Sequence, residues 1–319
     1  MPKAAEGAGR RTPSPSRGAR RVPSPANATG RPPSPARAAK PSPLAEAVGL
    51  LFDALDTTGT GTLPPKQLKE AQALLEPLVR SGDTSVRLPG RAVTAGDFER
   101  WALGILSTSE EPLEELTAAV TARARAVKPP FTPWSGTDAD RAHISAILDD
   151  ALFLTGWRGA YDAERMGKLR ITHVASIGSE FEGELPCADL GVEYFCVEIT
   201  DDEEQADVMQ EVLGSAVAFL DAAIRGGGRA VVHCAAGISR STTVVLAYLV
   251  AHRGMSLRAA FELAQRARPM VWPNLGFMRV LIRWEEQHRK GRASMRLRQY
   301  ELWTSYDEEE YSMAKVVDR

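Results

Sequence analysis

One stretch decides the fold of this chain of 319 residues: Val231-Val-His233-Cys234-Ala-Ala-Gly237-Ile-Ser239-Arg240-Ser241. A short apolar run, typical of a buried strand, leads through a glycine turn into a helical pattern. The backbone N–H groups of such a loop can converge on an anion at the N-terminus of the helix. Cys234 supplies a nucleophile, and Arg240 supplies a planar guanidinium that can hold two phosphoryl oxygens. The helix dipole and the cation favour the thiolate, so the sequence predicts a loop that binds an oxyanion and attacks it.

Strand and helix patterns alternate on both sides of this loop. Apolar runs predict strands over residues 144–148, 151–154, 171–177, 192–199 and 230–232. Helical periodicity predicts helices over residues 160–169, 206–224, 239–252, 257–266 and 275–290. The alternation predicts an α/β domain with a mostly parallel sheet flanked by helices. Ligands of such sheets bind at the carboxyl ends of the strands, where Cys234 lies.

The order His-Cys, five residues, Arg-Ser resembles the signature of the cysteine-dependent protein tyrosine phosphatase superfamily. The version that runs from Gly237 to Ser241 is similar to that of the dual-specificity protein phosphatases. The segment 268–277 also resembles the sequence that precedes the last helix of that family, and the likeness spans about residues 142–290. The resemblance implies hydrolysis of phosphotyrosine and of phosphoserine or phosphothreonine through a cysteinyl-phosphate intermediate, with no metal or other cofactor.

The resemblance also implies a role for each residue of the motif. Cys234 attacks phosphorus, and Arg240 binds the phosphoryl oxygens and stabilises the transition state. His233 helps to shape the loop and keep the thiolate ionised, and the hydroxyl of Ser241 eases departure of the thiolate during hydrolysis. The rest of the phosphate-binding loop consists of Ala235, Ala236, Gly237, Ile238 and Ser239.

An alcohol leaving group needs a proton, so a carboxylic acid must reach the pocket. The resemblance places this acid on the loop after the strand 192–199, which offers Asp201 and Asp202. Counting from the strand selects Asp201, whereas counting back from Ala206 selects Asp202. We favour Asp201 because strand geometry is stiffer than that of the following loop, and Asp202 stays open as the alternative.

The loop also bears on the substrate. Ala235, Ala236 and Ile238 carry no charge, whereas inositol-lipid phosphatases of the superfamily place lysines there. We therefore expect a phosphorylated protein as the substrate. A phosphoprotein-binding scaffold with weak or no activity is the alternative function, and it rests on the unusual N-terminal half of the chain.

The N-terminal half predicts an all-α module over residues 44–127. Apolar residues at helical spacing flank the loop 56–67, in which glycine stands sixth and leucine eighth, and this arrangement resembles an EF-hand. Only Asp56 is charged at the ligand positions, because the third, fifth and twelfth are Thr58, Thr60 and Gln67. We therefore expect a degenerate EF-hand-like module that binds a protein partner or packs on the next domain, rather than a calcium sensor.

The N-terminal residues differ in composition and charge from the rest of the chain. Residues 1–43 are rich in Pro, Ser, Arg and Ala, which predicts a disordered arm. The first 45 residues carry a net charge of +8 and the remainder −10, which gives the formal −2 of the whole chain. A Ser-Pro motif with a basic residue a few positions before it recurs at Ser14, Ser24, Ser34 and Ser42. We therefore expect the arm to contact a proline-directed kinase or an acidic surface. A solvated linker is the alternative.

The remaining boundaries and the compartment follow from composition too. The Pro-rich stretch 128–136 predicts a linker between the helical module and a catalytic domain over 137–292, and residues 293–319 form a charged tail. No run of 18 apolar residues occurs, which excludes a spanning helix. Three cysteines indicate a reducing compartment, so we expect a cytoplasmic protein, with the nucleus as the alternative. The prolines of the arm argue against organelle import, and the acidic body argues against nucleic-acid binding.

Overall fold

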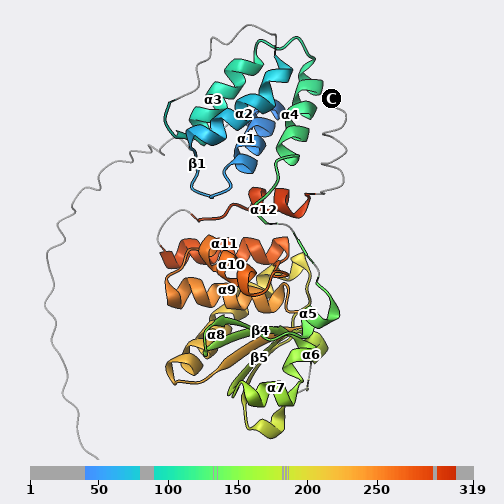
Figure 1. Cartoon of the computed structure of the whole chain (residues 1–319), viewed down its shortest axis with the longest axis vertical. Coiled ribbons are helices and arrows are strands. Elements are labelled where there is room, and N and C mark those ends of the chain that lie inside the picture. The colour runs from blue at the N-terminus through green and yellow to red at the C-terminus, as the bar shows by residue number, and fades with distance from the viewer. Residues whose placement is uncertain are drawn as a thin grey trace, which may run out of the picture. The chain divides into compact units, whose positions relative to one another are not determined.

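The computed structural model describes residues 40–79, 90–131, 133, 134, 136–181, 183, 185, 187–289 and 293–306 (Figure 1). Residues 41–319 form one compact unit. Two separate hydrophobic cores lie within it, one built by residues 47–124 and the other centred on the sheet and the later helices. Residues 1–39 of the predicted arm 1–43 and the acidic end of the tail, residues 307–319, lie outside the described residues.

The N-terminal core is built by four helices: α1 (Pro43–Leu55), α2 (Pro65–Leu75), α3 (Ala95–Leu106) and α4 (Leu113–Arg125). Ser42, which we assigned to the disordered arm, is instead the N-cap of α1, where its side chain accepts the N–H of Ala45. The apolar face of α1 is buried against α3 and α4.

The module is not purely helical. A 3-10 turn, Glu76–Leu78, follows α2, and strands β1 (Thr62–Leu63) and β2 (Val93–Thr94) pair antiparallel. The resemblance of this module to an EF-hand stays a prediction.

The second core surrounds a five-stranded sheet of order β3-β4-β7-β5-β6. Its strands are β3 (Ser145–Leu148), β4 (Leu152–Gly156), β5 (His173–Ile177), β6 (Glu193–Val197) and β7 (Ala230–Cys234). Our expectation of a mostly parallel sheet is wrong, because the sheet is mixed: β3 pairs antiparallel with β4 while the other pairs are parallel. The reason is the short connection between residues 148 and 152, which is too short for a parallel crossover.

Helices cover both faces of this sheet (Figure 1). One face packs against α8 (Ala206–Arg225), α9 (Arg240–Arg253), α10 (Leu257–Ala267) and α11 (Leu275–Arg289). The other face carries a smaller core that includes Met166, from α7 (Ala163–Lys168). Short elements complete the domain: α5 (Asp138–Ala142), α6 (Trp157–Ala160) and the 3-10 turns Ser179–Phe181, Ala188–Leu190 and Glu203–Gln205.

One predicted helix is divided in two. The expected helix over 160–169 is interrupted at residues 161 and 162, between α6 and α7. Asp162 is the cause, since its side chain accepts the N–H of Arg165 and starts α7 as an N-cap.

The expected charged tail begins inside the folded core rather than after it. Met295, Tyr300 and Trp303 are buried in the same core as α9, α10 and α11. The last two belong to a final helix, α12 (Leu297–Thr304). Apolar burial therefore continues beyond the boundary at residue 292. Among the helices that the structure describes, none is long and apolar enough to cross a membrane.

Candidate active site

The candidate site lies where the central strand of the sheet ends. Strand β7 finishes at Cys234, α9 starts at Arg240, and the loop between them stands at the carboxyl edge of the sheet. Gly237 has a φ of +67°, and a Cβ there would lie 2.5 Å from the carbonyl oxygen of Thr155. Only glycine fits this turn.

The sulfur of Cys234 is buried and faces two donors. The N–H of Gly237 lies 3.3 Å from the Sγ, and the hydroxyl of Ser241 lies 3.1 Å from it. Hydrogen bonds to a sulfur stabilise its charged form. The structure thus brings Ser241 to the sulfur of Cys234, as the resemblance implies.

The phosphate-binding loop turns its carbonyl groups outward. In a planar trans peptide the N–H points away from the C=O, so the N–H groups of this loop face the opposite side, toward the sulfur. Such a concave set of N–H groups binds anions. Four consecutive carbonyls accept hydrogen bonds from outside the loop: Ala235 from the N–H of Trp157 (3.2 Å), Ala236 and Gly237 from Arg268 (2.8 Å each) and Ile238 from the N–H of Trp272 (2.8 Å).

Arg268 holds this arrangement, and our sequence analysis assigned it no role. Its guanidinium is buried and also donates to the carbonyl oxygens of His143 (2.9 Å) and Arg141 (3.2 Å). Burial lowers the pKa of Arg268 to about 10, so the group stays charged at neutral pH. The one signal in the sequence is its place at the start of the segment 268–277.

Arg240 is oriented by a carboxylate that the sequence analysis also missed. Its two terminal nitrogens donate to Glu180 at 2.6 and 2.8 Å, and one of them also donates to the carbonyl of Ile199 at 3.1 Å. Burial is the largest single effect on Glu180 and opposes its charge, but the hydrogen bond from Arg240, a backbone hydrogen bond and the charge of Arg240 together outweigh it and lower the pKa of the carboxyl group. The guanidinium is thereby held beside the loop, and a bound phosphoryl group would offer it a second partner.

The two candidate acids occupy different environments. The carboxylate of Asp201 accepts the hydroxyl of Ser239 at 2.6 Å and the side-chain amide of Asn274 at 2.9 Å. The N–H of Asn274 donates in turn to Ser239 Oγ at 3.0 Å. Asp202, which is exposed as Asp201 is, precedes the 3-10 turn Glu203–Gln205. The geometry therefore favours Asp201 as the acid at the loop.

His233 lies behind the loop, packed edge-on against Phe181 with ring centroids 5.0 Å apart. Burial lowers its pKa to about 4, which keeps the imidazole neutral at neutral pH. A neutral ring shapes the loop but adds no positive charge beside the sulfur. The part of the expected role that depends on charge is therefore not supported.

A cleft of about 210 Å³ lies beside the loop, lined by Asp138, Arg141, Trp157, Arg158, Ala235 and Ala236. Arg158 forms an ion pair with Asp138 at 3.1 Å, and its guanidinium lies 5.5 Å from the ring centre of Trp157. Across the described part of the chain, no three His, Cys, Asp or Glu side chains cluster as metal ligands do.

A cysteine and an arginine at the two ends of an anion-binding loop define the class of cysteine-dependent phosphatases. Comparison with known proteins agrees: the sequence model of the dual specificity phosphatase catalytic domain matches residues 152–287. Human dual specificity phosphatase 28 is 37% identical over 136 residues, which is 43% of this chain and 74% of that protein. The chain belongs to the dual-specificity phosphatase family, which confirms the expected catalytic domain and the protein phosphatase class.

Other relatives cover the same region. A probable rhodanese domain-containing dual specificity protein phosphatase from Dictyostelium discoideum is 32% identical over 153 residues, which is 46% of this chain and only 31% of that protein. The crystal structure of human DUSP28 matches with 30% identity and a TM-score of 0.42, and the match covers 49% of this chain and 97% of that one.

Proposed function

We propose that this protein phosphatase hydrolyses phosphotyrosine and phosphoserine or phosphothreonine of proteins through a phosphate ester on Cys234. The observation that carries the proposal is that three groups meet at the phosphate-binding loop. The Cys234 sulfur faces the anion-binding loop, the Arg240 guanidinium stands beside it, and Asp201 is tied to the same loop through Ser239.

In the first step, the phosphoryl group would bind to the N–H groups of the loop and to Arg240. The sulfur of Cys234 then attacks phosphorus, and the bond from phosphorus to the substrate oxygen breaks. Asp201, in its protonated form, gives its proton to that oxygen, which leaves as an alcohol or phenol. Loop N–H groups and the guanidinium of Arg240 stabilise the charge that develops on the equatorial oxygens.

In the second step, a water molecule attacks the phosphorus of the cysteinyl phosphate. Asp201, now a carboxylate, accepts a proton from the water, and the bond from phosphorus to sulfur breaks. Sulfur leaves as a thiolate, which the Ser241 hydroxyl at 3.1 Å stabilises by donating a hydrogen bond. Inorganic phosphate is the second product, and the step uses no metal.

Support for a protein substrate comes from the phosphate-binding loop. Ala235 and Ala236 line the adjacent cleft together with the partly exposed ring of Trp157. The cleft also contains the charged side chains of Asp138, Arg141 and Arg158. Support for a protein substrate therefore rests on the loop residues themselves, which offer no lysine to the additional phosphates of an inositol lipid.

The test is hydrolysis of 4-nitrophenyl phosphate by the full chain and by its Cys234→Ser variant. We expect turnover by the wild type and none by the variant. Cys196→Ser, at an exposed cysteine outside the loop, is the matched control and should keep full activity. Equal turnover by Cys234→Ser would contradict the proposal. A wild-type chain that retains a phosphopeptide without hydrolysing it would favour the scaffold instead.

We also propose that residues 44–127 form an EF-hand-like module that uses no ion. Support comes from the loop itself, where the only carboxylate at a ligand position, that of Asp56, is fully buried and bonded to protein donors.

A further inference from the structure

We propose that the helical module positions the active-site acid through the C-terminal segment, residues 293–304. The segment joins the two hydrophobic cores: one side of it bonds to the loop at Asp56, and the other side packs behind the phosphate-binding loop. This inference rests on the proposed function, because it concerns the role assigned there to Asp201.

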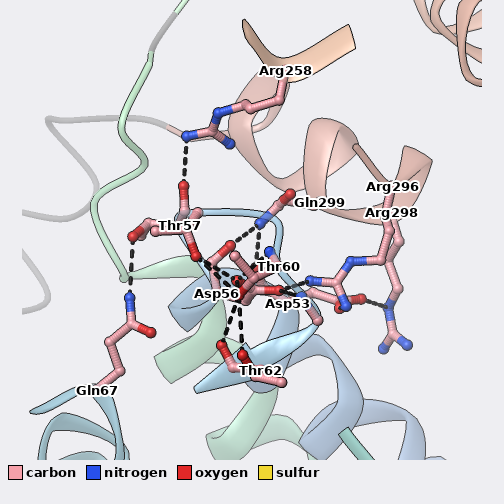
Figure 2. A network of polar contacts seen from close by, with 12 residues as sticks. Asp53, Asp56, Thr57, Thr60, Thr62, Gln67, Arg258, Arg296, Arg298 and Gln299 are labelled. Carbon is pink, nitrogen blue, oxygen red and sulfur yellow. Dashed lines mark hydrogen bonds and ion pairs between the residues drawn. The ribbon is translucent and has the colours of Figure 1, made fainter. Parts of the chain in front are cut away.

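In the first contact, the carboxylate of Asp56 is paired with an arginine and not with a metal ion. One carboxylate oxygen of Asp56 accepts the N–H of Thr60 at 3.1 Å, and the other accepts the N–H of Gly61 at 2.7 Å. That second oxygen also accepts Arg296 at 2.8 Å, and the same guanidinium lies 2.8 Å from Asp53 (Figure 2). The positive charge that a buried carboxylate needs therefore comes from the C-terminal segment.

The second contact lies one helical turn further along. The side-chain amide of Gln299 is fully buried and donates to the carbonyl oxygen of Asp53 at 2.9 Å and to that of Asp56 (Figure 2). Both carbonyls lie at the end of α1, and that of Asp56 also accepts the N–H of Gly59 at 3.1 Å. Arg296 and Gln299 thus fix α12 to the end of α1 in position and in rotation.

The opposite side of α12 holds the segment 272–274. The hydroxyl of Tyr300 donates to the carbonyl of Pro273 at 2.7 Å, and its ring stacks on Trp272 with centroids 4.9 Å apart. The indole N–H of Trp272 donates to the hydroxyl of Thr304 at 3.2 Å. Three contacts from one helix therefore hold Trp272 and Pro273, the two residues directly before Asn274.

Segment 272–274 is also part of the active site. The N–H of Trp272 donates to the carbonyl of Ile238 in the phosphate-binding loop at 2.8 Å. Asn274 bonds to Ser239 at 3.0 Å and to the carboxylate of Asp201 at 2.9 Å. The segment therefore lies between α12 and the catalytic groups, so a shift of α12 moves the partners of Asp201 directly.

The chemical consequence is specific to proton donation. Proton transfer depends on the distance and angle between donor and acceptor, and small misplacements cost rate. The attack by sulfur uses the loop and Arg240. Most of their supports do not involve α12, since Arg268 holds Ala236 and Gly237 and Glu180 holds Arg240. Among the described residues, only the contact of Trp272 with Ile238 and that of Asn274 with Ser239 pass through the segment that α12 touches. Arg296, Gln299 and Tyr300 are therefore positioning residues for Asp201, and their loss slows reactions in which the leaving oxygen needs a proton.

The experiment compares aryl phosphates whose phenols range from acidic to basic, with the full chain and the variants Arg296→Gln and Tyr300→Phe. For each variant we expect kcat/KM on 4-nitrophenyl phosphate close to that of the wild type and kcat/KM on phenyl phosphate roughly five- to tenfold lower, as loss of part of a general-acid contribution predicts. We compare kcat/KM because it reports the steps up to formation of the cysteinyl phosphate, whereas kcat also includes the water attack, which is the same for all substrates and also uses Asp201. The double variant should be no slower than the more affected single variant. Both changes break the same chain of contacts, which runs from Asp56 through α12 to the segment 272–274, so their effects should not add. Arg279→Gln, at an exposed arginine of α11, is the matched control.

Tyr300→Phe keeps the ring and its stacking on Trp272, so it tests the path even if Arg296→Gln unfolds the protein. The inference is overturned if both variants slow all substrates by the same factor, or if neither changes the dependence on the leaving group. Failure of the proposed function looks different: the wild type would then be inactive, or Cys234→Ser would remain active.

Discussion

Replacement of Arg268 by lysine tests whether one buried guanidinium sets the shape of the phosphate-binding loop. Arg268 donates to Gly237 through Nε and to Ala236 through Nη2, both at 2.8 Å, and to His143 at 2.9 Å through Nη1. A lysine ammonium keeps the charge but carries all its donors on one atom, so it cannot reach these three carbonyls together. At least two charge-assisted hydrogen bonds are lost. At about 1.5 to 3 kcal/mol each, the free energy of unfolding should fall by roughly 3 to 6 kcal/mol.

The same change should weaken anion binding. With two carbonyls released, the peptides of residues 236 and 237 can rotate, and their N–H groups no longer point at the phosphoryl oxygens. We expect kcat on 4-nitrophenyl phosphate to fall about 10²-fold, the usual cost of misplacing a donor to a developing oxyanion. The inhibition constant of inorganic phosphate should rise in parallel, because phosphate binds to the same loop.

Urea denaturation measures the first effect, and steady-state kinetics with phosphate as inhibitor measures the second. Arg283→Lys, at an exposed arginine of α11, controls for the chemistry of the substitution and should change neither quantity. The reasoning is refuted if Arg268→Lys retains the unfolding free energy of the wild type. It is also refuted if stability falls while phosphate inhibition is unchanged.

Three further outcomes are expected. Burial lowers the pKa of His233 from 6.5 to about 4. Between these two pH values, the imidazole is protonated in the unfolded chain and neutral in the native protein. Stability should therefore fall by about 3 kcal/mol more between pH 7 and pH 4 for the wild type than for His233→Asn, as urea denaturation at both values would show. Micromolar calcium should give no heat in calorimetry of the full chain, because Asp56 is already bonded to Arg296. Asp201→Asn should steepen the dependence of kcat/KM on leaving-group basicity, and Asp202→Asn should leave it unchanged.

Local patterns in the sequence predict most of the elements of this protein. The alternating runs from residue 144 to residue 290 correspond to strands β3 to β7 and helices α8 to α11, because apolar periodicity reports directly which face is buried. Strand direction is not encoded in that periodicity, so the antiparallel pairing of β3 with β4 was missed. It could have been found from the short connection between residues 148 and 152.

Within the site, the sequence points to groups that belong to one motif and misses those that meet it only in space. Cys234, Arg240 and Ser241 share a loop and a helix, so their proximity follows from chain geometry. Glu180 and Arg268 reach that loop from segments 60 and 31 residues away along the chain. Nothing near Glu180 distinguishes it from an ordinary charged surface residue, and the only signal for Arg268 is its place at the start of the segment 268–277.

The segment 293–304 was interpreted as a charged tail for a related reason. Its buried side chains, Met295, Tyr300 and Trp303, are spread among arginines and a glutamate, so average composition conceals them. Each of its arginines has a partner that lies more than 200 residues earlier in the chain, as Arg296 has in Asp56.

That late position in the chain has a consequence for biosynthesis. A ribosome makes the helical module, the sheet, the phosphate-binding loop and its nucleophile before it makes residues 293–304, which complete the second hydrophobic core. Early parts of a nascent chain fold first, so α12 is the last helix of the described fold to form. A nascent chain that stops short of this segment would carry a finished cysteine loop whose proton donor is not yet held in place. If α12 positions Asp201 as proposed, hydrolysis of substrates with basic leaving groups becomes efficient only after residue 304 has been made.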